Sequence, residues 1–139
     1  MFKQEKGVTL VALVITIIVL LILAGVSIAM LTGDNGVLTK SQDAVAKNAI
    51  AGAKDEVNLI YQETLTEYLE AKYTGATAVT LDTTMKSKID AMTTAQKHDC
   101  EVTMTGTTVT IKYSQNGKET TSEGTLTTTA GAETFTWTK

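Results

Sequence analysis

The sequence predicts an α+β fold, in which a long N-terminal helix packs on a C-terminal antiparallel β-meander of about four strands. Three observations support this class. An uncharged apolar run occupies residues 8–31, a helical hydrophobic period follows over residues 37–73, and the period changes to two from Cys100 onward. Because the helical patterns precede the strand patterns instead of alternating with them, an α+β arrangement is expected.

The first element is a helix over the apolar run Val8–Leu31. At about 1.5 Å per residue it is about 36 Å long, against a hydrocarbon core of about 30 Å. Its polar side chains are Thr9, Thr16 and Ser27, whose hydroxyls can donate to helix carbonyls one turn back. The run is therefore expected to lie in lipid or to pack against copies of itself.

The charges beside this run predict its orientation in a membrane. Lys3 and Lys6 precede the run, and Asp34 is the first charged residue after it. Positive charge keeps the N-terminus in the cytoplasm, so residues after about 33 are expected outside. A cleaved secretory signal would have a shorter apolar region of about 7–15 residues, whereas a plain single-pass anchor fits the hydropathy.

The glycine-rich tetrapeptide 33–36 predicts an interruption, either a full break or a local loosening of one long helix. Asn35 is the expected N-cap of the next helix, and Thr39 with Gln42 offers a second, capping-box start. Apolar residues then recur at steps of three, four and seven, and predict an amphipathic helix over 37–73. Its expected core-facing residues are Leu38, Val45, Ala49, Ala53, Val57, Ile60, Tyr61, Leu65, Tyr68 and Leu69.

Residues 74–139 are expected to form a small helix and the sheet, which together with the amphipathic helix make a globular head. The small helix starts at Asp82 or Thr83, and its apolar face holds Met85, Ile89 and Met92. Strand alternation then follows at Cys100, Val102 and Met104, at Val109, Ile111 and Tyr113, somewhere within 118–128, and at Phe135 and Trp137. Asn116-Gly117 predicts a hairpin turn.

Composition excludes several classes of function. The formal net charge is −3 and the chain contains no arginine, which argues against a nucleic-acid-binding surface. Cys100 is the single cysteine, so no intrachain disulfide can form, and it is expected to act as a small apolar residue. No nucleophile-base pair, phosphate loop or metal-ligand cluster is visible. We therefore expect no enzyme activity, no metal and no cofactor.

A specific motif lies at the start of the apolar run. Lys6-Gly7-Val8-Thr9-Leu10-Val11 is a short basic leader that ends in glycine and passes directly into the helix. It resembles the class III signal peptide of type IV pilins and prepilin-like proteins, and the run itself is similar to those of Gram-positive bacteria. The resemblance implies that prepilin peptidase removes residues 1–7 by cutting between Gly7 and Val8, and that the new amino group of Val8 is methylated.

The resemblance also implies a life history. The precursor is a single-pass protein of the cytoplasmic membrane with its head outside. An assembly platform and its ATPase then move it into an extracellular, homo-oligomeric helical filament on the cell surface. The helix over 8–33 becomes the filament core, and its assembly residues are Thr9, Ala12, Thr16 and Gly25.

Ala12 departs from the family pattern, which usually has glutamate at the fifth mature position to neutralise a neighbour's N-terminus. An ammonium without a partner in an apolar bundle costs several kcal/mol, so Thr9 and Thr16 hydroxyls or a position at a filament tip are alternatives. Two other functions remain open. One is a minor pilin or pseudopilin of a secretion or DNA-uptake machine, and the other is a membrane-tethered binding domain that does not polymerise.

Overall fold

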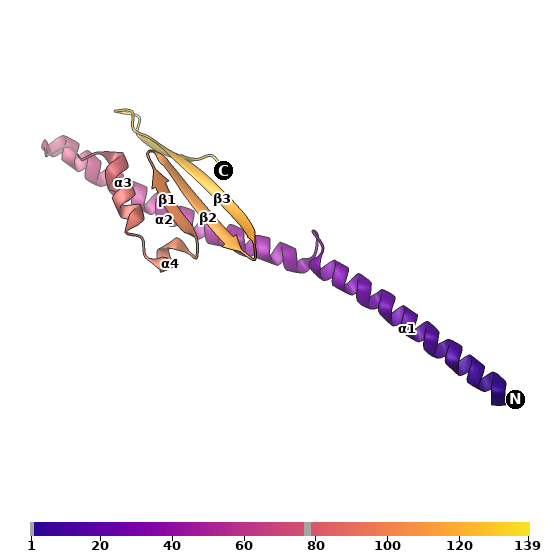
Figure 1. Ribbon diagram of the computed structural model, residues 1–139. Helices are drawn as coiled ribbons and strands as arrows, with labels where there is room; N and C mark the ends of the chain where they lie inside the picture. Colours follow the sequence, from indigo (N-terminus) through magenta and orange to yellow (C-terminus); the bar gives the residue numbers. More distant parts are fainter. Residues whose placement is uncertain (1, 77–78) are drawn as a thin grey trace. The chain divides into compact units, whose positions relative to one another are not determined.

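The computed structural model describes the backbone of residues 2–76 and 79–139, with side chains from residue 7 onward in those ranges. The helices are α1 (Phe2–Thr32), α2 (Val37–Thr74), α3 (Leu81–Asp90) and α4 (Thr94–Lys97). The strands are β1 (Glu101–Thr105), β2 (Thr108–Gln115), β3 (Lys118–Thr127) and β4 (Thr134–Trp137) (Figure 1). The α+β class is confirmed. The chain divides into two compact units, with the boundary between Ala44 and Val45.

In the first unit, α1 begins at Phe2 and not at Val8, so the expected leader residues share a helix with the apolar run. The hydroxyls in this helix are satisfied within it. Thr16 Oγ1 donates to the carbonyl of Leu13 and Ser27 Oγ to that of Leu23, each at 2.7 Å. These bonds confirm the expectation that the hydroxyls of Thr16 and Ser27 donate to carbonyls of the same helix.

The predicted interruption is a full break at residues 33–36. The amide of Gly36 donates to the carbonyl of Gly33 at 2.7 Å, and α2 starts at the next residue, Val37. A Cβ at Gly36 would lie 2.5 Å from the carbonyl oxygen of Leu31, so this turn requires glycine there. The expected caps at Asn35 and Thr39 are wrong. Thr39 lies inside α2, and its hydroxyl donates back to Gly33 at 3.0 Å because the turn brings that carbonyl close.

In the second unit, the four strands form one antiparallel sheet in the order β1-β2-β3-β4, the predicted meander. Figure 1 shows β1, β2 and β3 side by side in this sheet. The β2–β3 hairpin turns at Asn116 and Gly117, whose φ angles are 51° and 79°. Two consecutive positive φ angles match the right-handed twist of the flanking strands, which is why Asn-Gly is favoured.

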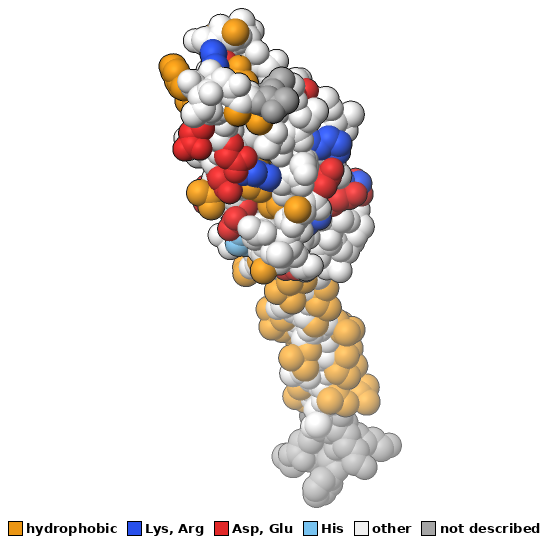
Figure 2. Space-filling model, turned by 90° about the vertical axis from the view of Figure 1, so that its left-hand side faces the viewer, with side chains coloured by type: hydrophobic (Ala, Val, Ile, Leu, Met, Phe, Trp, Pro, Cys, Tyr) orange, Lys and Arg blue, Asp and Glu red, His pale blue; other side chains and the backbone are white. Residues whose placement is uncertain are grey.

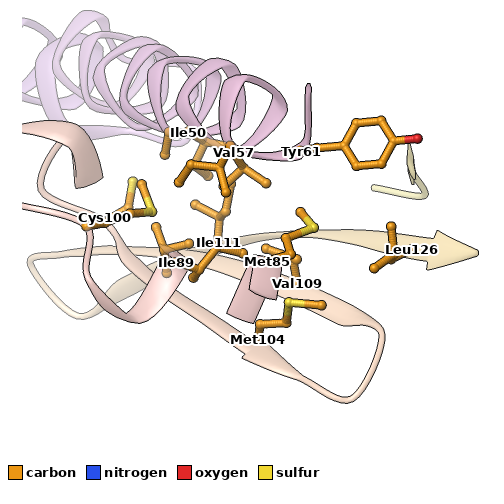
Figure 3. Packing of buried hydrophobic residues seen from close by; sticks show 14 of the residues in the cluster. Ile50, Val57, Tyr61, Met85, Ile89, Cys100, Met104, Val109, Ile111 and Leu126 are labelled. Carbon is orange, nitrogen blue, oxygen red and sulfur yellow. The ribbon is translucent and has the colours of Figure 1, made fainter. Parts of the chain in front are cut away.

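The core lies between α2, α3 and one face of the sheet (Figure 3). Val57 of α2 and Val109 and Ile111 of β2 are fully buried. The expected alternation is confirmed, since every second residue of β1 and β2 is buried. The other buried apolar residues are Ala46, Ile50, Ala53, Ile60, Tyr61, Leu81, Met85, Ile89, Met92, Cys100, Val102, Met104, Tyr113 and Leu126.

The buried line of α2 differs from the expected one near its start. Leu38 and Val45 are exposed, whereas Ala46 and Ile50 are buried. Steps of three and seven residues back from Ala53 reach Ile50 and Ala46, so the helical period passes beside Val45. Hydrophobicity alone favours the valine, but the sheet meets the neighbouring position.

The small helix also begins earlier than expected. Thr80 is the N-cap and α3 starts at Leu81, ahead of Asp82 and Thr83, because Leu81 itself is buried and extends the apolar face. The expected buried residues Met85, Ile89 and Met92 are confirmed.

Helix α4 was not predicted, although its signal is in the sequence. The hydroxyl of Thr93 accepts a hydrogen bond from the backbone amide of Gln96, and the side-chain oxygen of Gln96 accepts one from the backbone amide of Thr93. This reciprocal pair is a capping box. His98 and Asp99 then turn the chain with φ angles of 50° and 61°. The imidazole of His98 lies so near Gly52 of α2 that a Cβ there would be 2.9 Å from the ring.

The second face of the sheet is lined by threonine. The strand register places Thr105, Thr108, Thr125 and Thr136 in one row that crosses all four strands. These side chains are exposed or half-buried. β-Branched hydroxyl side chains suit such a pleated, hydrated surface, as the alternation of the sequence indicates.

Residues at and after β4 are tied to α2 and β3. Trp137 Nε1 donates to Asn58 Oδ1 at 3.0 Å, and Lys54 Nζ bonds the Lys139 carbonyl at 3.1 Å. The hydroxyl of Ser122 contacts the same carbonyl. These bonds anchor β4, the strand at the edge of the sheet, in a chain without a disulfide.

A matched pair of substitutions on α2 tests the core assignment. Val57→Ala should lower the free energy of unfolding by about 2 kcal/mol, since it opens a cavity under the sheet. Val45→Ala, at a position 51 % exposed, should change it by less than about 0.5 kcal/mol. Urea unfolding of the full chain in detergent, followed by Trp137 fluorescence, measures both. Equal losses would contradict the placement of the buried line.

A second pair tests the closure by β4. A Cβ at Gly124 would lie 2.5 Å from Phe135 Cζ and 2.9 Å from Trp137 Cε3. Gly124→Ala should therefore displace both rings, shift Trp137 emission to the red and cost about 1–3 kcal/mol. Thr121→Ala, at an exposed site on β3, is the control. Unchanged emission in Gly124→Ala would show that β4 packs elsewhere.

Candidate functional site

The expected cleavage site lies on an open part of α1. A Cβ added to Gly7 would meet no atom within 4 Å, and Val8 is 69 % exposed. Thr9 and Ala12 are also exposed. Glycine weakens a helix by about 1 kcal/mol relative to alanine, so the helix unfolds locally more easily at Gly7, as a protease requires.

The apolar surface of α1 extends around the whole helix. All described side chains from Val8 to Leu31 are exposed, and the large apolar ones among them are each about half exposed or more. Figure 2 shows hydrophobic side chains covering this helix on the side in view. Among the described residues, α1 supplies the one segment long and apolar enough to cross a membrane.

Three of the four expected assembly residues of α1 share one helix face. Thr9, Ala12 and Thr16 are three and four residues apart, so they lie on one helix face. Gly25 is farther along, and a Cβ there would meet nothing within 4 Å. These positions are the places where the backbone of a second helix can approach most closely.

From Val8 to Thr32, α1 contains no acidic residue that could lie beside the amino group that cleavage would create. Ala12 contributes only a methyl group, and the first acidic residue of the sequence after Val8 is Asp34. Asp34 lies beyond the end of α1, which extends about 36 Å from Val8 to Thr32. An amino group at Val8 would therefore find no carboxylate counter-charge within α1 itself.

The head holds few groups suited to chemistry. In the described ranges, no set of three or more His, Cys, Asp or Glu side chains is arranged to bind a metal ion. Burial, with the charge of Asp99 as a smaller cause, raises the pKa of the Cys100 thiol. This keeps the thiol protonated and unreactive, as expected for a small core residue. His98 is exposed.

Two further ionisable groups hold the β3–β4 connection to α2. The hydroxyl of Tyr61 donates to the carbonyl of Glu133 at 3.1 Å, and its ring lies 5.7 Å from that of Phe135. Burial and the Glu133 charge raise the pKa of Tyr61. The amides of Glu133 and Gly131 bond the Glu133 carboxylate and lower its pKa. These contacts of Tyr61 and Glu133 hold the β3–β4 connection in place, which is a structural role.

Two exposed apolar features were not expected from the sequence. An apolar hollow adjoins the break in the first unit, lined by Val26, Ala29, Met30, Gly33, Asp34, Asn35, Gly36 and Val37. In the second unit, Leu59 and Tyr73 of α2 are 62 % and 85 % exposed. Leu59 and Tyr73 lie on a different face of α2 from the buried residues. Their helical spacing is the sequence signal that could have revealed this exposed face.

The structure thus places Gly7, Val8, Thr9, Ala12, Thr16 and Gly25 on a single exposed helix whose surface nothing in its own unit covers. No protein family, curated protein or solved structure matches the chain.

Proposed function

We propose that this protein is a structural subunit of an extracellular type IV pilus-like filament, trimmed by prepilin peptidase and polymerised through α1. The observation that carries the proposal is the exposure of apolar side chains all around α1 from Val8 to Leu31. The second unit, by contrast, has a core of its own. A helix with no polar face needs a partner outside its own unit, and lipid followed by identical helices meets that need.

The steps follow from the charges and the packing. The precursor waits in the membrane with the Lys3 and Lys6 side in the cytoplasm. Cleavage after Gly7 removes both lysines and leaves Val8 as the first residue, so that its methylated amino group is the one remaining charge before Asp34. The assembly platform and its ATPase then supply the work of extraction. Because lipid tails are as apolar as the helix, the bundle is held by close packing, which Gly25 favours.

A second candidate, a minor pilin or pseudopilin, is favoured by Ala12. A subunit without a carboxylate near Val8 cannot neutralise the N-terminus of a neighbour inside a long bundle. At a tip, or in a short secretion or DNA-uptake pseudopilus, few such pairs are required. The abundance of the subunit in sheared filaments separates the two candidates.

The Gly7→Ala variant tests the processing step. Alanine should fit at Gly7 and at Gly25 without contact, so both variants should fold alike. We expect the wild type and Gly25→Ala to begin at a methylated Val8, and Gly7→Ala to keep residues 1–7 and stay in the membrane. Mass spectrometry of the N-terminus, with and without prepilin peptidase, measures this together with the sheared surface fraction.

Two results would count against the proposal. One is a wild-type chain that keeps Met1 in cells with an active peptidase, which favours a membrane-tethered domain that never polymerises. The other is Gly7→Ala in sheared fibres at the wild-type level.

A further inference from the structure

The side of α2 that faces away from the sheet has its own pattern. In the second unit, exposed residues recur there at steps of three, four and seven, while Val57 and Ile60 on the opposite side are buried. Leu59 and Tyr73 are the large apolar members, and Asp55 is the charged one. The residues of this outer stripe are Asn48, Ala51, Asp55, Leu59, Gln62, Thr66 and Tyr73.

A basic flank lies on one side of the outer stripe. Lys54 marks this side, since its Nζ lies 5.1 Å from the centre of the Trp137 ring on β4 and bonds the carbonyl of Lys139. Lys47 is seven residues earlier, so it lies two turns along the same flank and is exposed.

An acidic flank lies on the other side. Glu56, Glu63 and Glu70 are also spaced by seven residues. Glu63 marks their side of the helix, because its carboxylate lies 3.1 Å from Nζ of Lys88 on α3. Nζ of Lys88 also lies 2.7 Å from Glu67, so Glu63 shares this single cation with a second carboxylate. The side chain of Glu63 is 61 % exposed.

From this pattern we infer that the outer stripe of α2 docks on the same helix of a second copy of the chain, in parallel, with the basic flank of one copy against the acidic flank of the next. The inference deepens the proposed function and rests on it, because it assigns a subunit contact within the filament. Both rows step by seven residues, so one shift pairs Lys47 with Glu63 and Lys54 with Glu70. That shift is 16 residues, or about 24 Å.

The charge pattern excludes the simpler arrangements. In an antiparallel two-fold pair, like flanks meet and repel. In an unshifted parallel pair, the lysines of one copy would not lie opposite the glutamates of the other, because the lysines lie nearer the start of α2 than the glutamates. A shifted contact is heterologous, and repeating it gives an open helical polymer instead of a closed dimer. A shift of nine residues would pair Lys47 with Glu56 and Lys54 with Glu63. The larger shift is preferred because both of its carboxylates, Glu63 and Glu70, are exposed, whereas Glu56 is half-buried.

The two kinds of contact have different roles. Leu59 and Tyr73 supply apolar area that leaves water on docking. Exposed ion pairs are individually weak and screened by salt, so the two rows mainly select the direction and the register of the copies.

Charge reversal with rescue tests the contact in the full chain, in cells that assemble it. Lys47→Glu and Glu63→Lys should each lower the amount of sheared filament at least about fivefold, since each turns an attraction into a repulsion. The double variant should return to within about twofold of wild type. Lys86→Glu, an exposed charge on α3, is the control and should assemble normally.

The outcomes separate this contact from the proposed function. N-termini at Val8 and abundant wild-type filaments, together with a double variant no better than the single ones, would overturn the α2 contact alone. A wild-type chain that is neither trimmed nor shed would overturn the proposed function itself.

Crosslinking gives a second readout in intact cells. A Lys47→Cys/Glu63→Cys chain treated with a short bis-maleimide should give a ladder of multimers, because each copy links to two others. Either single cysteine alone should give at most dimers, and Cys100 is buried from the reagent. Absence of a ladder from the double-cysteine chain, with filaments present, would contradict the head-to-tail arrangement.

Discussion

The apolar surface of α1 is the constraint on which the other features of this protein depend. A helix that exposes valine, leucine and isoleucine on all sides over Val8–Leu31 has no stable state alone in water. The hydroxyls of Thr16 and Ser27 donate to carbonyls of α1 itself, so these donors are already used within the helix. What accepts such a helix is lipid or a set of equally apolar helices. Specificity therefore has to come from small residues, from the ends of the helix and from the second unit.

The second unit is built so that it does not depend on that helix. Its core joins α2, α3 and the sheet, with Val57, Met85 and Ile111 fully buried. The chain has no disulfide, and Cys100 serves as core packing. The last strand is held instead by Trp137 on Asn58 and by the contacts of the Lys139 carbonyl. A unit with its own core can keep its structure while its attached helix changes surroundings, which is what the proposed transfer from membrane to filament requires.

Much of this fold is local in the sequence, and that part was predictable. The Asn116-Gly117 turn and the alternation in β1 and β2 fix the hairpin and its buried face without reference to distant residues. The buried side of α2 was predicted well where Val57 and Ile60 lie, but wrongly at Val45. There the position of the sheet decides between adjacent residues, and a helical pattern alone does not contain it. The start of α3 at Leu81 and the presence of α4 likewise depend on tertiary contacts and on short capping signals.

The candidate site divides in the same way. Gly7 and Val8 form a local motif that is visible in the sequence, and the helical spacing of Leu59 and Tyr73 could have indicated their exposed face. The sides of α2 on which the charged flanks lie emerge only from the contacts of Lys54 with β4 and of Glu63 with α3.

The place of β4 along the chain has a consequence for the order in which the molecule is completed. Strand β4 follows the other three strands in sequence, and it pairs with β3 while Trp137 reaches back to Asn58 on α2. During synthesis, one side of β3 therefore stays unpaired until Thr134–Trp137 has been made. The sheet is therefore incomplete until β4 has been made. A nascent chain stalled before that point would expose the unpaired edge of β3, which quality-control proteins could recognise.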